Sequence, residues 1–183
     1  TENPELLWAL RGGGGNFGVV TRLDLALHPL DPNVFARLAL FDATRARDVL
    51  RRFRDVMNDA PDELSLAFAY ITAPDEEDVP EGLRGRPAVI VAGMWAGNVE
   101  DGERALAPIR DLGPDADFFA PTIYADFQCS IDDPPGYRNY WTAENVVDLP
   151  DEAIDVIVAR SAELPAGPSQ LFIVAWGGAV ARF

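Results

Sequence analysis

The residues with the clearest chemical potential lie near the N-terminus, where Gly12–Gly15 is followed by Asn16, Phe17 and Gly18. Four consecutive glycines leave no side chain between the backbone and an approaching group. Glycine also reaches positive φ without steric cost, so such a run can curl its N–H groups around an anion such as a pyrophosphate. The run also matches G-x-G-x-x-G, the fingerprint of dinucleotide-binding loops.

The flanking residues give the order of elements around this glycine run. Residues 3–5 read Asn-Pro-Glu, which is typical of a helix start, and leucines at helical spacing follow as far as Leu10. Residues 19–27 begin with β-branched side chains and then alternate apolar with polar, which predicts a strand. The dinucleotide fingerprint requires a strand before the loop and a helix after it, so the order here excludes a Rossmann unit. From the residues alone, a glycine-rich turn without a ligand remains an equal alternative.

Few other groups in the sequence could carry chemistry. His28 is the only histidine and Cys129 the only cysteine. This count excludes an internal disulfide and a cysteine zinc cluster, and it argues against a Ser-His-Asp triad or a histidine-rich metal site. Neighbouring acids such as Asp132 and Asp133 lie in acidic loops, where we interpret them as solvated. We therefore expect no metal, and any redox chemistry must come from a bound organic cofactor.

Charge and hydropathy narrow the class of partner. The chain has 183 residues, with 30 acidic and 15 basic side chains and a net charge of −15. Such a surface repels nucleic acid and anionic membranes, and no apolar run approaches the roughly 18 residues of a membrane span. The first residue is not Met and no signal sequence follows it, so we expect a fragment and favour a cytoplasmic over a secreted location.

The chain after the proline-rich boundary at residues 29–33 predicts an α+β fold. The expected elements in chain order are strand 34–41, a helix capped by Asp42, strands 64–71 and 88–95, helix 98–112, a short strand within 117–123, a turn at 132–136, a helix from 150 and strand 170–176. Strand 88–95 is apolar throughout and is expected at the centre of the sheet. We expect an antiparallel sheet covered on one face by helices, with the other face open to a partner.

The block formed by residues 3–21, NPELLWALRGGGGNFGVVT, and residues 27–30, LHPL, resembles one block of the berberine-bridge-enzyme-like FAD-linked oxidases. These enzymes belong to the vanillyl-alcohol-oxidase superfamily, which has a PCMH-type FAD-binding domain. The resemblance implies that residues 1–30 are the C-terminal end of an FAD-binding domain. It implies that residues 31–183 are most of a substrate-binding α+β domain, incomplete at its C-terminus.

In that family the glycine block lies against FAD, mainly through backbone atoms. The resemblance therefore assigns cofactor contacts to Gly12, Gly13, Gly14, Gly15, Asn16, Phe17, Gly18, Val19 and Val20. Arg11 is a weaker candidate, because its side chain can instead pair with carboxylates of the preceding helix.

The same resemblance places a substrate beside the open face of the sheet. Val174 and Trp176 alternate to one face of the last predicted strand, and Tyr140 and Gln128 lie in irregular segments rich in aromatic residues. Each of these four residues could equally be ordinary core, so they are candidate substrate contacts only. The family's flavin-linking histidine and catalytic base correspond to regions outside this chain, so the catalytic residue is unknown.

The resemblance implies a parent enzyme that transfers a hydride from a sugar, an alcohol or a secondary metabolite to FAD, with O2 as the final oxidant. We expect these 183 residues alone to be inactive and to bind FAD weakly or not at all. The alternative is a non-catalytic α+β module that uses its open sheet face to bind a partner or a second copy of itself. Only an oxidase needs coding sequence upstream for the rest of a flavin domain.

Overall fold

The computed structural model describes residues 3–130, 132, 136, 138–177 and 180. Its centre is an antiparallel sheet with the order β4-β1-β3-β2-β6, and β5 extends the β4 edge by pairing with the other end of β1. The strands are β1 (Asn33–Asp42), β2 (Leu64–Thr72), β3 (Pro87–Trp95), β4 (Ala116–Asp117), β5 (Ala120–Ile123) and β6 (Leu171–Val174). The predicted antiparallel α+β fold is confirmed, and the apolar strand 88–95 corresponds to the central strand β3.

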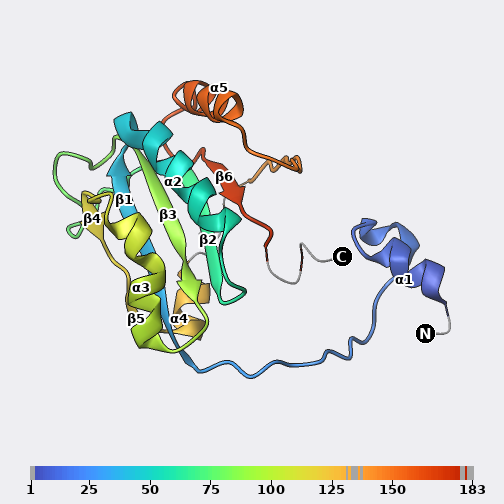
Figure 1. Ribbon diagram of the computed structural model, residues 1–183. Coiled ribbons are helices and arrows are strands. Elements are labelled where there is room, and N and C mark those ends of the chain that lie inside the picture. Colours follow the sequence, from blue (N-terminus) through green and yellow to red (C-terminus); the bar gives the residue numbers. More distant parts are fainter. Residues whose placement is uncertain (1–2, 131, 133–135, 137, 178–179, 181–183) are drawn as a thin grey trace.

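Three helices, α2 (Ala46–Asn58), α3 (Val99–Arg110) and α5 (Asp151–Ser161), cover one face of this sheet (Figure 1). Burial of apolar side chains between the two layers drives their packing. The core is built from Phe35, Phe41, Phe68, Val89 and Val91 of the strands and from Val49, Leu50, Phe53, Leu106, Ile109 and Ile154 of the helices. No helix among the described residues is long and apolar enough to cross a membrane.

Side-chain caps mark the start of two helical segments, the short 3₁₀ helix that leads into α2 and the helix α3. The carboxylate of Asp42 accepts hydrogen bonds from the N–H of Thr44 at 2.9 Å and from its hydroxyl at 2.6 Å, ahead of the short 3₁₀ helix η2 (Ala43–Arg45). The side chain of Asn98 accepts from the N–H of Asp101 at 2.8 Å at the start of α3. Both caps satisfy backbone donors that have no partner within the helix.

The N-terminal segment stands apart from the sheet (Figure 1). It consists of α1 (Pro4–Leu10), the 3₁₀ helix η1 (Gly14–Phe17) and an extended stretch that leads into β1. The predicted helix and glycine loop are present, but the strand predicted at 19–27 is wrong, because no strand among the described residues pairs with it. A strand needs a neighbour for its backbone hydrogen bonds. Without one, Leu25 and Leu27 are 73% and 89% exposed.

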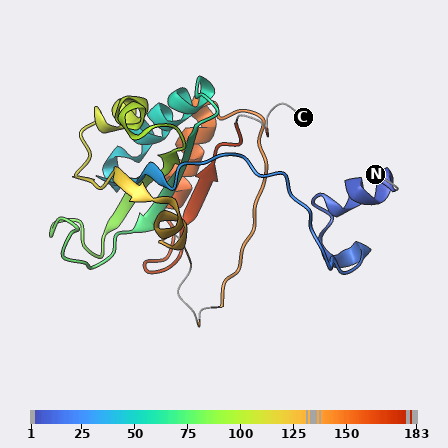
Figure 2. The same cartoon turned by 90° about the horizontal axis from the view of Figure 1, so that it is seen from below.

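Two further differences from the predicted elements bear on the candidate site. Gln128 lies on a short helix, α4 (Tyr124–Cys129), and not in an irregular segment. Figure 2 shows α4 on the side of the sheet opposite α2 and α3. Strand β6 ends at Val174, so Trp176 lies just beyond the strand and not within it. Most of the turn predicted at 132–136 falls outside the described residues.

Candidate functional site

The glycine run forms a tight loop at the end of α1. The N–H of Gly13 donates to the carbonyl oxygen of Ala9 at 3.1 Å, and Gly14 adopts a φ of +65°. A Cβ atom at Gly13 would lie 2.2 Å from the oxygen of Ala9 and 2.4 Å from the ring of Phe17. The loop's own conformation therefore requires glycine at position 13, for space, and favours it at position 14, for backbone angle.

Gly15 differs from these neighbours. It has no left-handed φ, and no atom outside the adjoining residues lies within 4 Å of the place where its Cβ would be. The fold of this chain therefore does not require glycine at position 15. A bare, exposed backbone of this kind suits close approach by a ligand from outside the chain. The exposed residues Arg11, Asn16, Phe17, Val19 and Val20 adjoin it in the same segment.

The open face of the sheet carries the other candidate residues. On β6, Leu171 and Ile173 pack against the core, whereas Phe172 and Val174 are 44% and 47% exposed on the opposite face. The expected alternation along this strand is therefore present. Trp176, directly after the strand, is 65% exposed.

The remaining two candidates are also solvent-exposed. Gln128 is exposed on α4, and Tyr140, at 91% exposure, lies on the segment between α4 and α5. The glycine loop is separated from this face by the extended stretch that leads into β1 (Figures 1 and 2). The structure thus contains two candidate surfaces, one on the loop and one on the sheet, and does not bring them together.

Two titratable groups near the C-terminal end of β1 have shifted pKa values, and both shifts have structural causes. Hydrogen bonds from Thr44 lower the pKa of Asp42, which caps η2. Burial raises the pKa of the Tyr70 hydroxyl, and the nearby charge of Asp42 raises it further. Among the described residues, no group of three or more His, Cys, Asp or Glu side chains could hold a metal ion.

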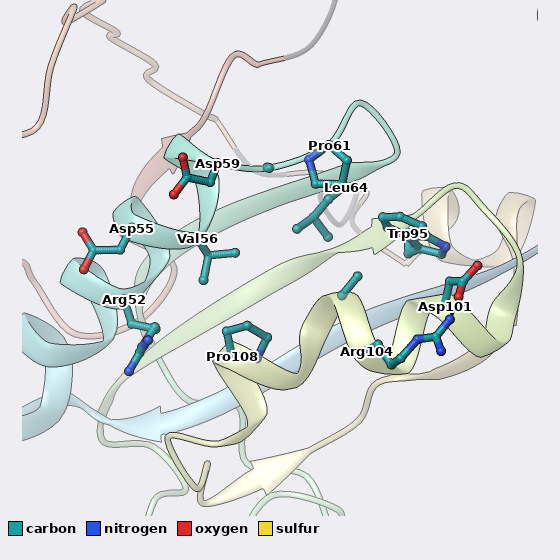
Figure 3. A pocket seen from close by; sticks show the side chains of 12 residues that line it. Arg52, Asp55, Val56, Asp59, Pro61, Leu64, Trp95, Asp101, Arg104 and Pro108 are labelled. Atoms are coloured by element: carbon teal, nitrogen blue, oxygen red, sulfur yellow. Dashed lines mark hydrogen bonds and ion pairs between the residues drawn. The ribbon is translucent and has the colours of Figure 1, made fainter.

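A groove of about 660 Å³ between α2 and α3 was not predicted from the sequence (Figure 3). Its apolar surface includes Val56, Leu64 and Trp95, and Arg52 and Asp101 are among its charged residues. The position of Trp95 at the end of an apolar strand is the one sequence signal that could have indicated it. The groove lies on the helix-covered side of the sheet, opposite the face that carries Val174.

The comparisons with known proteins involve both candidate surfaces. No family model matches the chain. An FAD-linked oxidoreductase of Dictyostelium discoideum is 27% identical over 97% of the chain, and (R)-6-hydroxynicotine oxidase of Paenarthrobacter nicotinovorans is 29% identical over 98%. A shorter match, over 36% of the chain, is 41% identical to the FAD-linked oxidoreductase aurO of Gibberella zeae. The chain is homologous to the FAD-linked oxidoreductases.

The chain also shares its fold with a solved structure. The crystal structure of 6-hydroxy-D-nicotine oxidase from Arthrobacter nicotinovorans matches 97% of the chain with a TM-score of 0.69, at 22% sequence identity. A match of this extent includes the N-terminal segment as well as the sheet, which confirms the predicted α+β architecture. The chain spans 40% of that structure, and 37% of the length of each of the two relatives that match nearly all of it.

Proposed function

We propose that this FAD-linked oxidoreductase homologue supplies the end of an FAD-binding domain, residues 1–30, and most of a substrate-binding domain, residues 31–183. The observation that carries the proposal is the bare backbone at Gly15, in a loop that the chain's own packing does not cover. The homology to FAD-linked oxidoreductases over 97% of the chain supports FAD as the ligand of that loop.

The exposed loop suits a large, partly anionic cofactor held by backbone groups. Residues 12–20 would contact FAD, and Arg11 would lie at the margin of the site. Bound FAD would accept a hydride from a substrate C–H bond while a base takes the O–H or N–H proton, and O2 would reoxidise it. We place the catalytic base outside this chain, and we expect the isolated 183 residues to be inactive.

The open face of the sheet is the proposed wall of the substrate site. Val174 and Trp176 would contribute from β6 and the residues that follow it, Gln128 from α4 and Tyr140 from the adjoining segment. A small organic molecule is the proposed substrate, within the broad range of sugars, alcohols and secondary metabolites. The apolar exposure of Phe172 and Val174 supports an apolar contact at this wall.

The visible absorption spectrum of the complete polypeptide that contains this chain, recorded before and after acid precipitation, tests the proposal. We expect a flavin spectrum. Colour that stays with the pellet indicates covalent attachment, and colour released to the supernatant indicates non-covalent binding. A folded, colourless polypeptide that takes up no added FAD contradicts the proposal.

The second candidate function is a non-catalytic module that binds a second copy of itself. The exposed leucines of the N-terminal segment, Leu25 and Leu27, together with Phe172, favour it. Sedimentation equilibrium of the 183-residue chain, with and without FAD, separates the two functions. A tight dimer that is indifferent to FAD supports the module, and a chain that remains monomeric contradicts it.

A further inference from the structure

The groove between α2 and α3 is lined by one stripe of side chains from each helix (Figure 3). On α2 the stripe contains Arg52, Asp55 and Val56, and it continues to Asp59, the residue directly after the helix. On α3 the lining residues have the same spacing, at positions 101, 104, 105 and 108. Residues three, four and seven positions apart lie on one side of a helix, so each helix forms a continuous edge of the groove.

The floor of the groove is apolar. Val56, Leu64 and Trp95 lie between the two helices (Figure 3), and Leu64 and Trp95 are direct partners in the β2–β3 ladder. Ala105 and Pro108 supply the apolar part of the α3 edge. Binding in this groove would therefore be driven by burial of apolar side chains that an occupant brings.

Three of the charged side chains that line the groove are already paired within the fold. The carboxylate of Asp55 lies 2.9 Å from the guanidinium of Arg54, and Asp101 forms an ion pair with Arg104. These charges are compensated before any partner arrives.

The other two charged side chains of the groove, Arg52 and Asp59, are exposed. Within the part of the chain that the structure describes, neither side chain forms a hydrogen bond or an ion pair. Their positions differ by seven residues, which is about 10 Å along a helix. The α2 edge of the groove therefore has a free positive charge at one end and a free negative charge at the other.

The backbone around the groove favours a helical occupant over an extended one. Trp95 lies on β3, which is paired with β1 on one side and with β2 on the other throughout residues 88–95. The two flanking helices satisfy their backbone groups internally. A peptide extended along the groove would find no strand to pair with, whereas a helix needs no partner for its backbone hydrogen bonds.

We propose that this groove docks an amphipathic helix of another protein. The docked helix places an acidic residue beside Arg52, a basic residue two turns away beside Asp59, and apolar residues between them against the floor. Apolar anchors at three-, four- and seven-residue spacing are the general form of helix-in-groove recognition, and charges at the rim set the orientation. The groove lies on the opposite side of the sheet from the proposed substrate wall, so the inference does not rest on the binding of FAD or substrate.

Fluorescence anisotropy with three labelled peptides tests this inference on the complete polypeptide that contains the chain. Each peptide is an alanine-based helix of about 15 residues, with two leucines between two charged positions that are two turns apart. The charged pair is Glu and Lys in the first peptide, two Glu in the second and two Lys in the third. Further charges on the far face make the net charge of the three peptides equal, so the chain's net charge of −15 affects all of them alike. We expect the Glu and Lys peptide to bind about threefold more tightly than either of the others, because a rim ion pair contributes modestly.

Charge variants of the groove should change which peptide binds best. Asp59→Lys should favour the peptide with two Glu, and Arg52→Glu should favour the peptide with two Lys. Both positions are exposed, so both variants should fold. Asp48→Lys changes an exposed acid of α2 that does not line the groove, and it should keep the order of the parent polypeptide.

Filling the groove tests its apolar part. Ala105→Leu should weaken the binding of all three peptides about tenfold, whereas Ala159→Leu, the same enlargement at an exposed position of α5, should not. Circular dichroism establishes that each variant is folded. The inference is overturned if no peptide binds the parent, if the three peptides bind equally, or if Arg52→Glu and Asp59→Lys leave the order unchanged. A dimer that Asp59→Lys dissociates in sedimentation equilibrium would also overturn it, because the occupant would then be a second copy and not another protein.

Discussion

Gly102 of α3 lies so close to Phe35 of β1 that a Cβ atom at Gly102 would be 2.4 Å from the Cβ of Phe35. Gly102 is buried, and Phe35 is 1% exposed in the core between the helices and the sheet. The missing side chain at position 102 thus allows α3 to approach β1 closely.

Gly102→Ala should destabilise the fold. Alanine favours a helix over glycine by about 1 kcal/mol, but overpacking a core costs about 1–3 kcal/mol, so we expect a net loss of up to about 2 kcal/mol. Urea denaturation followed by circular dichroism measures this loss. Glu103→Ala, a change at the exposed neighbouring position in the same helix, should have little effect. A Gly102→Ala variant as stable as the parent chain would show that α3 can shift away from Phe35 at no cost.

Asp151 at the start of α5 joins that helix to α2. Its carboxylate accepts a hydrogen bond from Arg54 at 2.6 Å and lies 3.1 Å from Arg51. The hydrogen bond from Arg54 is the main cause of the lowered pKa of Asp151. The folded-state pKa of Asp151 lies below the ordinary value of about 3.9. The stability that its charged carboxylate contributes through the two arginines is therefore complete well above about pH 3.9, and it is lost as the pH falls through the folded-state pKa.

Asp151→Asn should therefore lower the urea midpoint near neutral pH, and the difference from the parent chain should shrink below about pH 4. The measurement is urea denaturation at neutral and at acidic pH. Glu152→Gln changes an exposed acid in the same first turn of α5 and controls for the helix dipole. A difference between Asp151→Asn and the parent that does not change with pH would show that the ion pair is not the cause.

Arg45 links the end of α3 to the start of α2. Its guanidinium donates to the carbonyl oxygens of Gly113, at 2.6 Å, and of Leu112, and it lies 5.1 Å from the centre of the Phe41 ring. These carbonyls follow the last turn of α3, where backbone acceptors lack helical partners.

Arg45→Ala should cost about 1–2 kcal/mol of stability, because it removes two charge-assisted hydrogen bonds and a cation–π contact. Chemical denaturation gives the value, and Arg45→Lys should recover only part of it, since lysine cannot form the same fork of donors. Arg52→Ala, at an exposed position of α2, is the control. Full recovery in Arg45→Lys would contradict a role for the guanidinium geometry.

Gly15→Ala tests the cofactor loop. Because the structure contains no neighbour within 4 Å of a Cβ at this position, the variant should fold normally, yet it should weaken FAD binding to the complete polypeptide about tenfold or more. FAD titration followed by flavin fluorescence measures the effect. Gly82→Ala, at an equally open glycine of the acidic loop, should leave FAD binding unchanged. Unaltered affinity for FAD in Gly15→Ala would show that the backbone at this position does not contact the cofactor.

Local sequence patterns were sufficient to predict those helices and strands whose own residues show a clear apolar pattern. The helix expected after Asp42 is present as α2, where Val49, Leu50 and Phe53 lie at the helical spacing that brings side chains to one buried face. The uninterrupted apolar run of β3 indicated its central place. Helix α4 was missed because its six residues are too short to show a helical period.

The strand predicted at 19–27 is absent from the structure for a different reason. Its alternating pattern is present, but the described residues include no strand to pair with it, so its leucines remain exposed. A strand's hydrogen bonds depend on a second segment, and no pattern within the strand itself can supply that segment.

The sequence by itself determined the helix and glycine loop at the N-terminus, the α+β order that follows, and the resemblance to FAD-linked oxidases, because each of these is encoded in contiguous residues. Only the tertiary structure decided that Ala67 and Ala92 meet as partners, that Asp151 binds Arg54, and that the backbone at Gly15 is left uncovered. These relationships join residues far apart in the chain, or depend on what packing leaves empty. Strand register and side-chain packing, which exist only in the folded chain, therefore determine them.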